Sequence, residues 1–104
     1  TFAATNQENA SYPVGICAER TLLSAVSSLQ TDALIKTIAI SYYNTNGESN
    51  KPISPCGICR QSLLEYETRF NTQVKIIMSG LVGEVLVVKS TKQLLPFNFS
   101  SGDL

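Results

Sequence analysis

Hydrophobic residues recur at two different periods along the chain, and each period predicts its own kind of element. Between residues 17 and 29 apolar side chains return every three or four positions, which predicts an amphipathic helix. Residues 35–43 alternate apolar and polar side chains and are rich in β-branched and aromatic residues, which predicts a strand. The apolar positions of the helix are Ala18, Leu22, Ala25, Val26 and Leu29, and those of the strand are Ile38, Ile40 and Tyr42.

The second half of the chain repeats a helix followed by strands. A loop rich in Asn, Gly, Ser and Pro (residues 44–55) leads into a helix that we expect to open at Pro55 and Cys56, because proline suits a first helical turn. Dense runs of Val, Ile and Leu predict strands at residues 74–78 and 84–88, with both faces covered. The expected buried stripe of the helix is Cys59, Leu63, Tyr66 and Phe70.

The two ends of the chain are expected to hold less regular structure. Residues 1–5 have the pattern of a strand end, residues 91–95 that of a short helix, and residues 100–104 that of a loose tail. The order strand, helix, strand, helix, strand, strand predicts the α/β class, a layered sandwich with helices packed on a mixed β-sheet. The length fits one domain, residues 1–104.

Composition and charge exclude several classes of function. The formal net charge is zero and charged residues make up 15%, so the basic stripe of a nucleic-acid surface is missing and we expect no nucleic-acid partner. No apolar run approaches the roughly 20 residues of a membrane span, so we expect no membrane partner. The first residues lack the charged and apolar regions of a signal peptide, which favours reduced cysteines and a cytoplasmic location.

The three cysteines carry the candidate chemistry. Cys17 starts the first predicted helix, and Cys56 and Cys59 form a Cys-x-x-Cys pair at the start of the second. An odd number of thiols leaves one over in a disulfide framework, whereas three thiolates leave open the fourth position of a catalytic Zn²⁺. Backbone N–H groups at a helix start also stabilise thiolates. We therefore expect these cysteines to bind one Zn²⁺; burial as ordinary apolar side chains is the alternative.

Charged neighbours of the cysteines add to this pattern. Glu19 can reach a metal-bound water without ligating the metal and is the candidate general acid–base; the alternative is a favourable charge in a first helical turn. Arg20 and Arg60 each follow a site residue, and we expect them to donate hydrogen bonds to thiolate sulfur or else to form surface ion pairs. The chain has no histidine, which rules out a Ser-His or Cys-His nucleophile pair.

With these motifs the chain resembles the zinc-dependent cytidine deaminases that act on free nucleosides. The resemblance implies that Cys17, Cys56 and Cys59 hold zinc and that Glu19 is the catalytic proton carrier. It implies hydrolysis of cytidine and deoxycytidine to uridine and deoxyuridine, a step of pyrimidine salvage. The matching residues are Asn6-Gln7-Glu8-Asn9-Ala10, Tyr12-Pro13-x-Gly15-x-Cys17-Ala18-Glu19-Arg20-Thr21, Pro55-Cys56-Gly57-x-Cys59-Arg60-Gln61 and Leu94-Leu95-Pro96-x-x-Phe99.

The resemblance also implies substrate contacts and an assembly. Asn6 and Glu8 resemble the pair that grips the ribose hydroxyls, and the Ala18 backbone resembles the group that contacts the pyrimidine edge. Arg20 resembles the arginine that bonds zinc thiolates. Phe99 is similar to the tail aromatic that reaches a neighbour's pyrimidine in a homotetramer. Without the resemblance, Asn6 and Glu8 are ordinary loop residues and Phe99 is an ordinary core or interface aromatic.

The chain departs from the family pattern in two places. Ser100-Ser101 stand where the family has Gly-Pro, and the family has a helix and a strand ahead of residue 1. We therefore expect either a longer natural protein or a domain that lacks its N-terminal helix and first strand. The other functions that remain open are a deaminase of another cytosine-bearing substrate, a non-catalytic zinc-stapled domain and a family member that has lost its activity.

Overall fold

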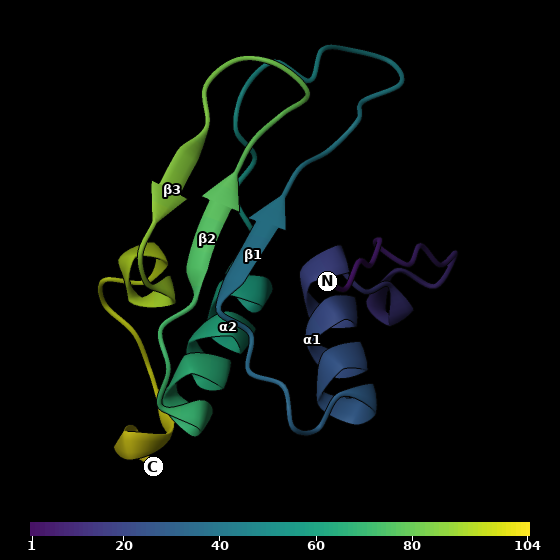
Figure 1. Ribbon diagram of the computed structural model, residues 1–104. Helices are drawn as coiled ribbons and strands as arrows, with labels where there is room; N and C mark the ends of the chain where they lie inside the picture. The colour runs from purple at the N-terminus through teal and green to yellow at the C-terminus, as the bar shows by residue number, and fades with distance from the viewer. The chain divides into compact units, whose positions relative to one another are not determined.

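The computed structural model describes all 104 residues, which form two compact units, residues 1–34 and residues 35–104. The first unit contains a short 3₁₀ helix and helix α1, and the second contains helix α2 and the sheet (Figure 1). The expectation of a single domain stays a prediction. None of the helices combines the length and the apolar character needed to cross a bilayer.

Helix α1 (Ala18–Leu29) confirms the first predicted helix. Cys17 is its N-cap residue, and the Cys17 carbonyl accepts the backbone N–H of Thr21 at 3.0 Å. Leu23 and Val26 are its buried side chains, so the predicted stripe is right at Val26 and wrong at Leu29, which is 68% exposed. Leu29 is the last helical residue, where the chain leaves the helix through Gln30 and the stripe ends.

Residues 1–5 do not form the predicted strand. A strand needs a neighbour for its N–H and C=O groups, and no strand of the sheet pairs with this segment. The nearest ladder contact is an isolated antiparallel bridge between Gln7 and Ile16, closed by two backbone hydrogen bonds of 2.8 and 3.0 Å. The bridge folds residues 7–16 into a closed loop that contains the 3₁₀ helix η1 (Tyr12–Val14).

The second unit is built on a three-stranded sheet in the order β1-β2-β3 (Figure 1). β1 and β2 are parallel with Ile38 opposite Ile76, whereas β2 and β3 are antiparallel with Ile77 opposite Val87. The predicted mixed sheet is therefore confirmed, although β1 is shorter than residues 35–43 because it pairs with only four residues of β2. The strands are β1 (Thr37–Ile40), β2 (Lys75–Met78) and β3 (Leu86–Val88).

Helix α2 (Gly57–Phe70) confirms the second predicted helix, with a correction at its start. Cys56 is the N-cap residue, so Pro55 precedes the helix and does not lie in its first turn. An N-cap residue keeps an extended backbone, and the residue before a helix is a position that proline tolerates as well. Asn71 ends the helix in the left-handed conformation (φ 49°), which asparagine adopts more readily than most residues.

The core of the second unit lies between α2 and the sheet. The Tyr66 hydroxyl accepts the backbone N–H of Ile35 at 2.9 Å and so ties α2 to the chain that enters β1. Phe70 was predicted to be buried but is 38% exposed, because it is the last residue of α2; its ring packs on that of Tyr66 with centroids 4.6 Å apart. The buried apolar residues are Ile38, Cys59, Leu63, Leu64, Tyr66, Val74, Ile76 and Met78.

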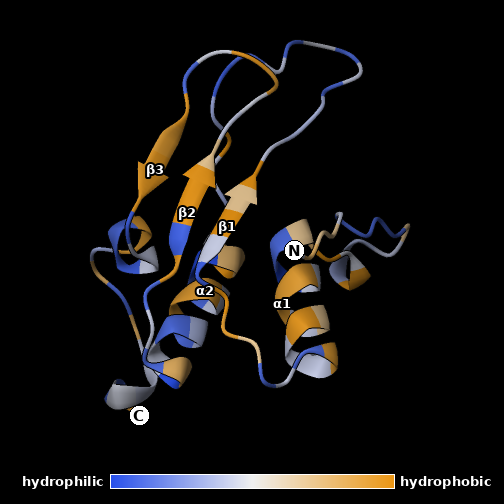
Figure 2. Ribbon diagram, in the orientation of Figure 1, coloured by the Kyte–Doolittle hydropathy of each residue, from blue (hydrophilic) through white to orange (hydrophobic).

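Strand β3 is not covered on both faces, contrary to the prediction. Leu86 and Val87 are 49% and 55% exposed, and Figure 2 shows β3 as a hydrophobic strand. β3 is one of the two edge strands and has β2 as its one neighbour in the sheet, whereas the central strand β2 buries Ile76 and Met78. The turn between β2 and β3 contains Gly83 at φ 93°, a conformation that favours glycine.

The C-terminal segment is more regular than predicted. The short helix expected at residues 91–95 is the 3₁₀ helix η2 (Thr91–Leu94). The tail is not loose, because residues Ser101–Asp103 form a further 3₁₀ helix, η3. The Asp103 carboxylate accepts the backbone N–H of Ser100 at 2.8 Å, which satisfies a donor that a helix start otherwise leaves unpaired.

Candidate metal centre and substrate site

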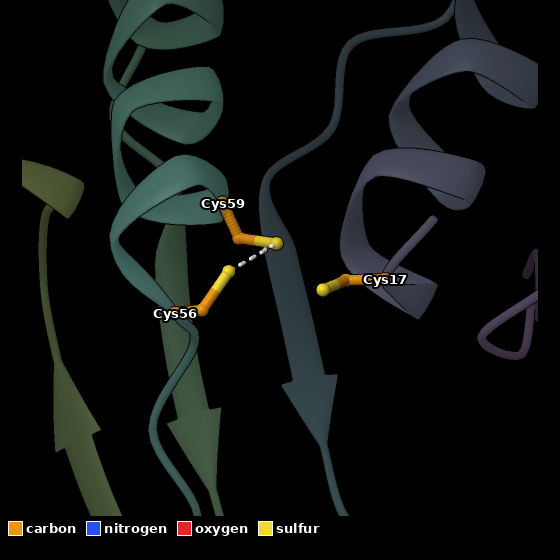
Figure 3. A group of neighbouring side chains, drawn as sticks. All are labelled: Cys17, Cys56 and Cys59. Atoms are coloured by element: carbon orange, nitrogen blue, oxygen red, sulfur yellow. Dashed lines mark hydrogen bonds between the residues drawn. The ribbon is translucent and has the colours of Figure 1, made fainter. Parts of the chain in front are cut away.

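The start of α2 holds two of the predicted metal ligands. Cys56 is the N-cap residue and is exposed, whereas Cys59 lies one turn later and is fully buried. Their sulfur atoms are 3.3 Å apart (Figure 3). Two sulfurs that each bind one Zn²⁺ at about 2.3 Å lie no more than about 4.6 Å apart, so this pair fits a single ion. The N–H groups of the first turn of α2 stabilise negative charge on these sulfurs.

Arg60 joins the residue directly before this cysteine pair to the C-terminal segment. Its Nε donates to the Pro55 carbonyl at 2.8 Å, and its Nη1 donates to the Leu94 carbonyl at 3.1 Å. Pro55 is buried, so the residue directly before Cys56 is fixed both by packing and by this hydrogen bond. Arg60 therefore shapes the cysteine turn through carbonyl groups, and a hydrogen bond from Arg60 to thiolate sulfur stays a prediction.

The first unit holds the remaining ligand candidate and the candidate proton carrier. Cys17 caps α1 and is half-buried, and Figure 3 draws its side chain at the beginning of that helix. Glu19 lies in the first turn of α1, two residues after this cap. Ala18 is the first helical residue, so its N–H is one of the four that no carbonyl of the helix accepts. Arg20 follows in the same turn, and the metal and catalytic roles of these residues stay predictions.

Asn6 and Glu8, the predicted ribose pair, are hydrogen-bonded to each other. The Asn6 amide donates to the Glu8 carboxylate at 2.5 Å. The two residues flank Gln7, whose bridge to Ile16 closes the loop one residue before Cys17. Residues on either side of a bridged position in an extended chain project to one side, so the amide and the carboxylate form a single polar group. Both side chains are exposed, and contact with a ribose stays a prediction.

Phe99, the predicted pyrimidine contact, is held through its backbone. Its side chain is 59% exposed, and its carbonyl accepts a hydrogen bond from Nε2 of Gln61 at 2.8 Å. Gln61 belongs to the matching motif at the start of α2, although the sequence assigned it no role. Its contact with a residue 38 positions away could not be read from any local pattern.

Glu67 is the polar residue that the sequence analysis missed. It is 3% exposed, and its carboxylate accepts the backbone N–H groups of Val74 and Thr91 and the Ser90 hydroxyl at 2.6, 2.9 and 2.8 Å. Burial alone would raise the pKa of Glu67, but these hydrogen bonds outweigh it and hold the pKa below its ordinary value. A signal was present, because Glu67 follows Leu63 by four residues and so lies on the buried stripe of α2.

A polar hollow of about 340 Å³ lies at the C-terminal end of α2, the end opposite the cysteines. Its first lining residue, Glu67, follows Cys59 by eight residues, so about 12 Å of helix separates this hollow from the Cys56–Cys59 turn. Nothing in its lining matches the expected metal or substrate groups. The lining residues are Glu67, Thr68, Asn71, Thr72, Gln73 and Lys92.

Comparison with known proteins places these residues in a family. The family model of the cytidine and deoxycytidylate deaminase zinc-binding region matches residues 1–75. That range contains Cys17, Cys56 and Cys59, each of which offers one sulfur ligand. The donor set is the one that zinc prefers, and zinc is the metal of this region.

Individual relatives agree with the family model. The cytidine deaminase of Mycoplasma genitalium is 48% identical over 67 residues, which are 64% of this chain and 47% of that protein. The cytidine deaminase of Halalkalibacterium halodurans is 31% identical over 100 residues, which are 95% of this chain and 67% of that protein. The chain thus spans about half the length of the Mycoplasma relative and two thirds of the other.

A solved structure supports the α/β fold. The crystal structure of the cytidine deaminase from Burkholderia pseudomallei is 36% identical, with a TM-score of 0.68 over 90% of this chain and 68% of that one. The cysteine pair on α2, the matched zinc-binding region and these relatives lead to one conclusion. The chain belongs to the cytidine and deoxycytidylate deaminase family, and it carries that family's zinc-binding region.

Proposed function

We propose that this chain catalyses the hydrolysis of cytidine and deoxycytidine to uridine and deoxyuridine, with release of ammonia. The observation that carries the proposal is the match of the zinc-binding region to residues 1–75, a range that includes all three cysteines and Glu19. The names of the relatives support it, since each is a cytidine deaminase. The bond that breaks joins C4 to its amino group in a cyclic amidine.

The proposed metal ligands are Cys17, Cys56 and Cys59. The 3.3 Å separation of the Cys56 and Cys59 sulfurs supports this assignment, as does the position of Cys17 and Cys56 at helix N-caps. When bound, zinc supplies the Lewis acidity that makes a water nucleophilic near neutral pH. Three thiolates leave a negative charge on the site, which the two helix starts and the arginines Arg20 and Arg60 offset.

Glu19 is the proposed general acid–base. It takes a proton from the attacking water and delivers it to N3 of the pyrimidine. It then takes the remaining proton from the new C4 hydroxyl and passes it to the amino group, which leaves as ammonia while the C4 carbonyl forms. The Ala18 backbone orients the pyrimidine edge, and the Asn6–Glu8 pair binds the ribose hydroxyls. The 2.5 Å hydrogen bond between Asn6 and Glu8 supports the last assignment, because a preformed pair loses less conformational freedom on binding.

The proposed assembly is a homotetramer in the cytoplasm that acts in pyrimidine salvage. In this assembly Phe99 reaches the pyrimidine held by a neighbouring subunit. The high exposure of Phe99 and of Leu86 and Val87 supports an assembly, because apolar side chains left in water favour contact with another surface.

The test is the loss of ultraviolet absorbance when cytidine is converted to uridine. The purified chain should turn over cytidine, lose activity after treatment with a zinc chelator, and regain it when Zn²⁺ is added back. Turnover of another cytosine-bearing compound in place of cytidine would favour the related-deaminase alternative. A chain that binds zinc but turns over neither compound would favour the non-catalytic zinc domain or a degenerate family member.

A further inference from the structure

Two consecutive side chains at the start of α2 hold the C-terminal segment, residues 94–104. Nη1 of Arg60 donates to the Leu94 carbonyl at 3.1 Å, and Nε2 of Gln61 donates to the Phe99 carbonyl at 2.8 Å. Both lie within two residues of Cys59, so the turn that carries the cysteine pair also sets the path of the tail.

The hydrogen bond from Gln61 is the one that determines where Phe99 lies. The Phe99 side chain is 59% exposed, so packing against the core does not fix the ring. The neighbouring polar groups act within the tail itself, because Asn98 donates to the Leu95 carbonyl and Ser100 donates to Asp103. These bonds set the local conformation of the tail, and the hydrogen bond from Gln61 joins the tail backbone at Phe99 to α2.

We propose that Gln61 is a positioning residue for nucleoside binding, which fixes the backbone of Phe99 so that its ring is presented to the pyrimidine held by a neighbouring subunit. The inference rests on the proposed role of Phe99. Gln61 touches neither the metal ligands' sulfurs nor the substrate in this scheme, so its loss should weaken binding and leave the chemical step alone. Its effect should therefore appear in KM and not in kcat.

The first experiment replaces Gln61 by methionine, which keeps the length of the side chain and its helix propensity but removes the donor. We expect Gln61→Met to raise KM for cytidine about three- to tenfold, the loss expected for one exposed hydrogen bond, with kcat and bound zinc unchanged. Ser62→Ala is the matched control, because the next hydroxyl along α2 bonds only to the Ile58 carbonyl of its own helix. The inference would be overturned if Phe99→Ala raises the KM for cytidine and Gln61→Met leaves that KM unchanged.

A double-mutant cycle then asks whether Gln61 acts through Phe99. If it does, Gln61→Met adds nothing to the KM of Phe99→Ala, because the ring that it positions is already gone. Independent, multiplicative effects of the two changes would overturn the inference and leave the proposed function standing. If Phe99→Ala itself has no effect on KM, the proposed role of the aromatic fails, and the inference fails with it.

A spectroscopic readout tests the attachment without any turnover. The chain contains no tryptophan, so Phe99→Trp provides a single reporter on the tail. Adding Gln61→Met to this reporter should lower its fluorescence anisotropy and raise its quenching by acrylamide, whereas adding Ser62→Ala should change neither. Unchanged anisotropy and quenching would overturn the attachment. A chain without cytidine turnover that still shows these changes would count against the proposed function and not against the attachment.

Discussion

The carboxylate of Glu67 accepts the backbone N–H of Val74 at 2.6 Å, which joins the end of α2 to the start of β2. The same carboxylate accepts the Thr91 N–H and the Ser90 hydroxyl, so one buried charge connects a helix, a strand and the segment that begins η2. A carboxylate with three donors prefers its ionised form. The hydrogen bonds of Glu67 therefore contribute to stability only while the group carries its charge.

The stability of the fold should depend on Glu67 at acid pH. Because the folded-state pKa lies below the ordinary value of 4.5, the contribution is fully present above the unfolded pKa and is lost as the pH falls through the folded pKa. The free energy of unfolding, measured with urea, should fall between pH 7 and pH 3. In Glu67→Gln this fall should be smaller. At pH 7, Glu67→Gln should lower the free energy of unfolding by about 1–3 kcal/mol, because a buried donor loses its acceptor.

The control for this prediction is Glu65→Gln on the same helix. Glu65 pairs with Arg69 at 3.3 Å on an exposed face, where such a pair contributes little. We expect its urea midpoint and pH dependence to match those of the unmodified chain. Equal pH dependence in Glu67→Gln and the unmodified chain would contradict the role of Glu67.

Removal of the buried sulfur should remove the metal. Cys59→Ser replaces a thiolate that lies 3.3 Å from its partner sulfur with a hydroxyl, a poorer zinc ligand. Zinc content measured by atomic emission should fall from one ion per chain to well below half, and turnover should fall with it. Ile58→Ala is the control in the same turn, since Ile58 is 63% exposed, and it should keep its zinc. Full zinc content in Cys59→Ser would remove this residue from the ligand set.

Loss of the Glu19 carboxylate should abolish turnover while zinc stays bound. Glu19→Gln keeps the size of the side chain but cannot carry a proton between water and pyrimidine, so kcat should fall by a factor of about 10²–10⁴. The readouts are the ultraviolet assay and zinc content of the same preparation. Asp32→Asn changes an exposed acid that follows α1 and should leave both unchanged. Turnover that survives Glu19→Gln would assign the proton transfer to another group.

The Asn6–Glu8 pair should matter only for substrates that have a ribose. Glu8→Gln removes the charge that the Asn6 amide contacts at 2.5 Å, and it should raise KM for cytidine about tenfold or more, because hydrogen bonds to charged groups are the stronger ones. Free cytosine has no ribose hydroxyls, so we expect it to be turned over more weakly than cytidine. Its turnover should be the same in Glu8→Gln and in the unmodified chain. An equal loss for cytidine and cytosine would argue against a ribose contact.

The two helices and the mixed sheet were predicted closely, whereas the strand at residues 1–5, the length of β1 and the exposure of β3 were not. The starts of both helices, with Cys17 and Cys56 as N-cap residues, were predicted to within a residue, because an apolar period and its first position are local features that a short stretch of chain displays. The strand expected at residues 1–5 failed for the opposite reason, since a strand exists only through a partner that local sequence does not identify. The exposure of Leu86 and Val87 likewise depends on the edge position of β3.

The sequence by itself determined which residues are candidate metal ligands, because residue type and the spacing from Cys56 to Cys59 over one helical turn are properties of the chain. Only the tertiary structure decided that Glu67 is buried under three donors and that Gln61 reaches Phe99. Those contacts join residues that are between 7 and 38 positions apart. Such pairs meet only when the whole unit has packed, since no propensity or period specifies them in advance.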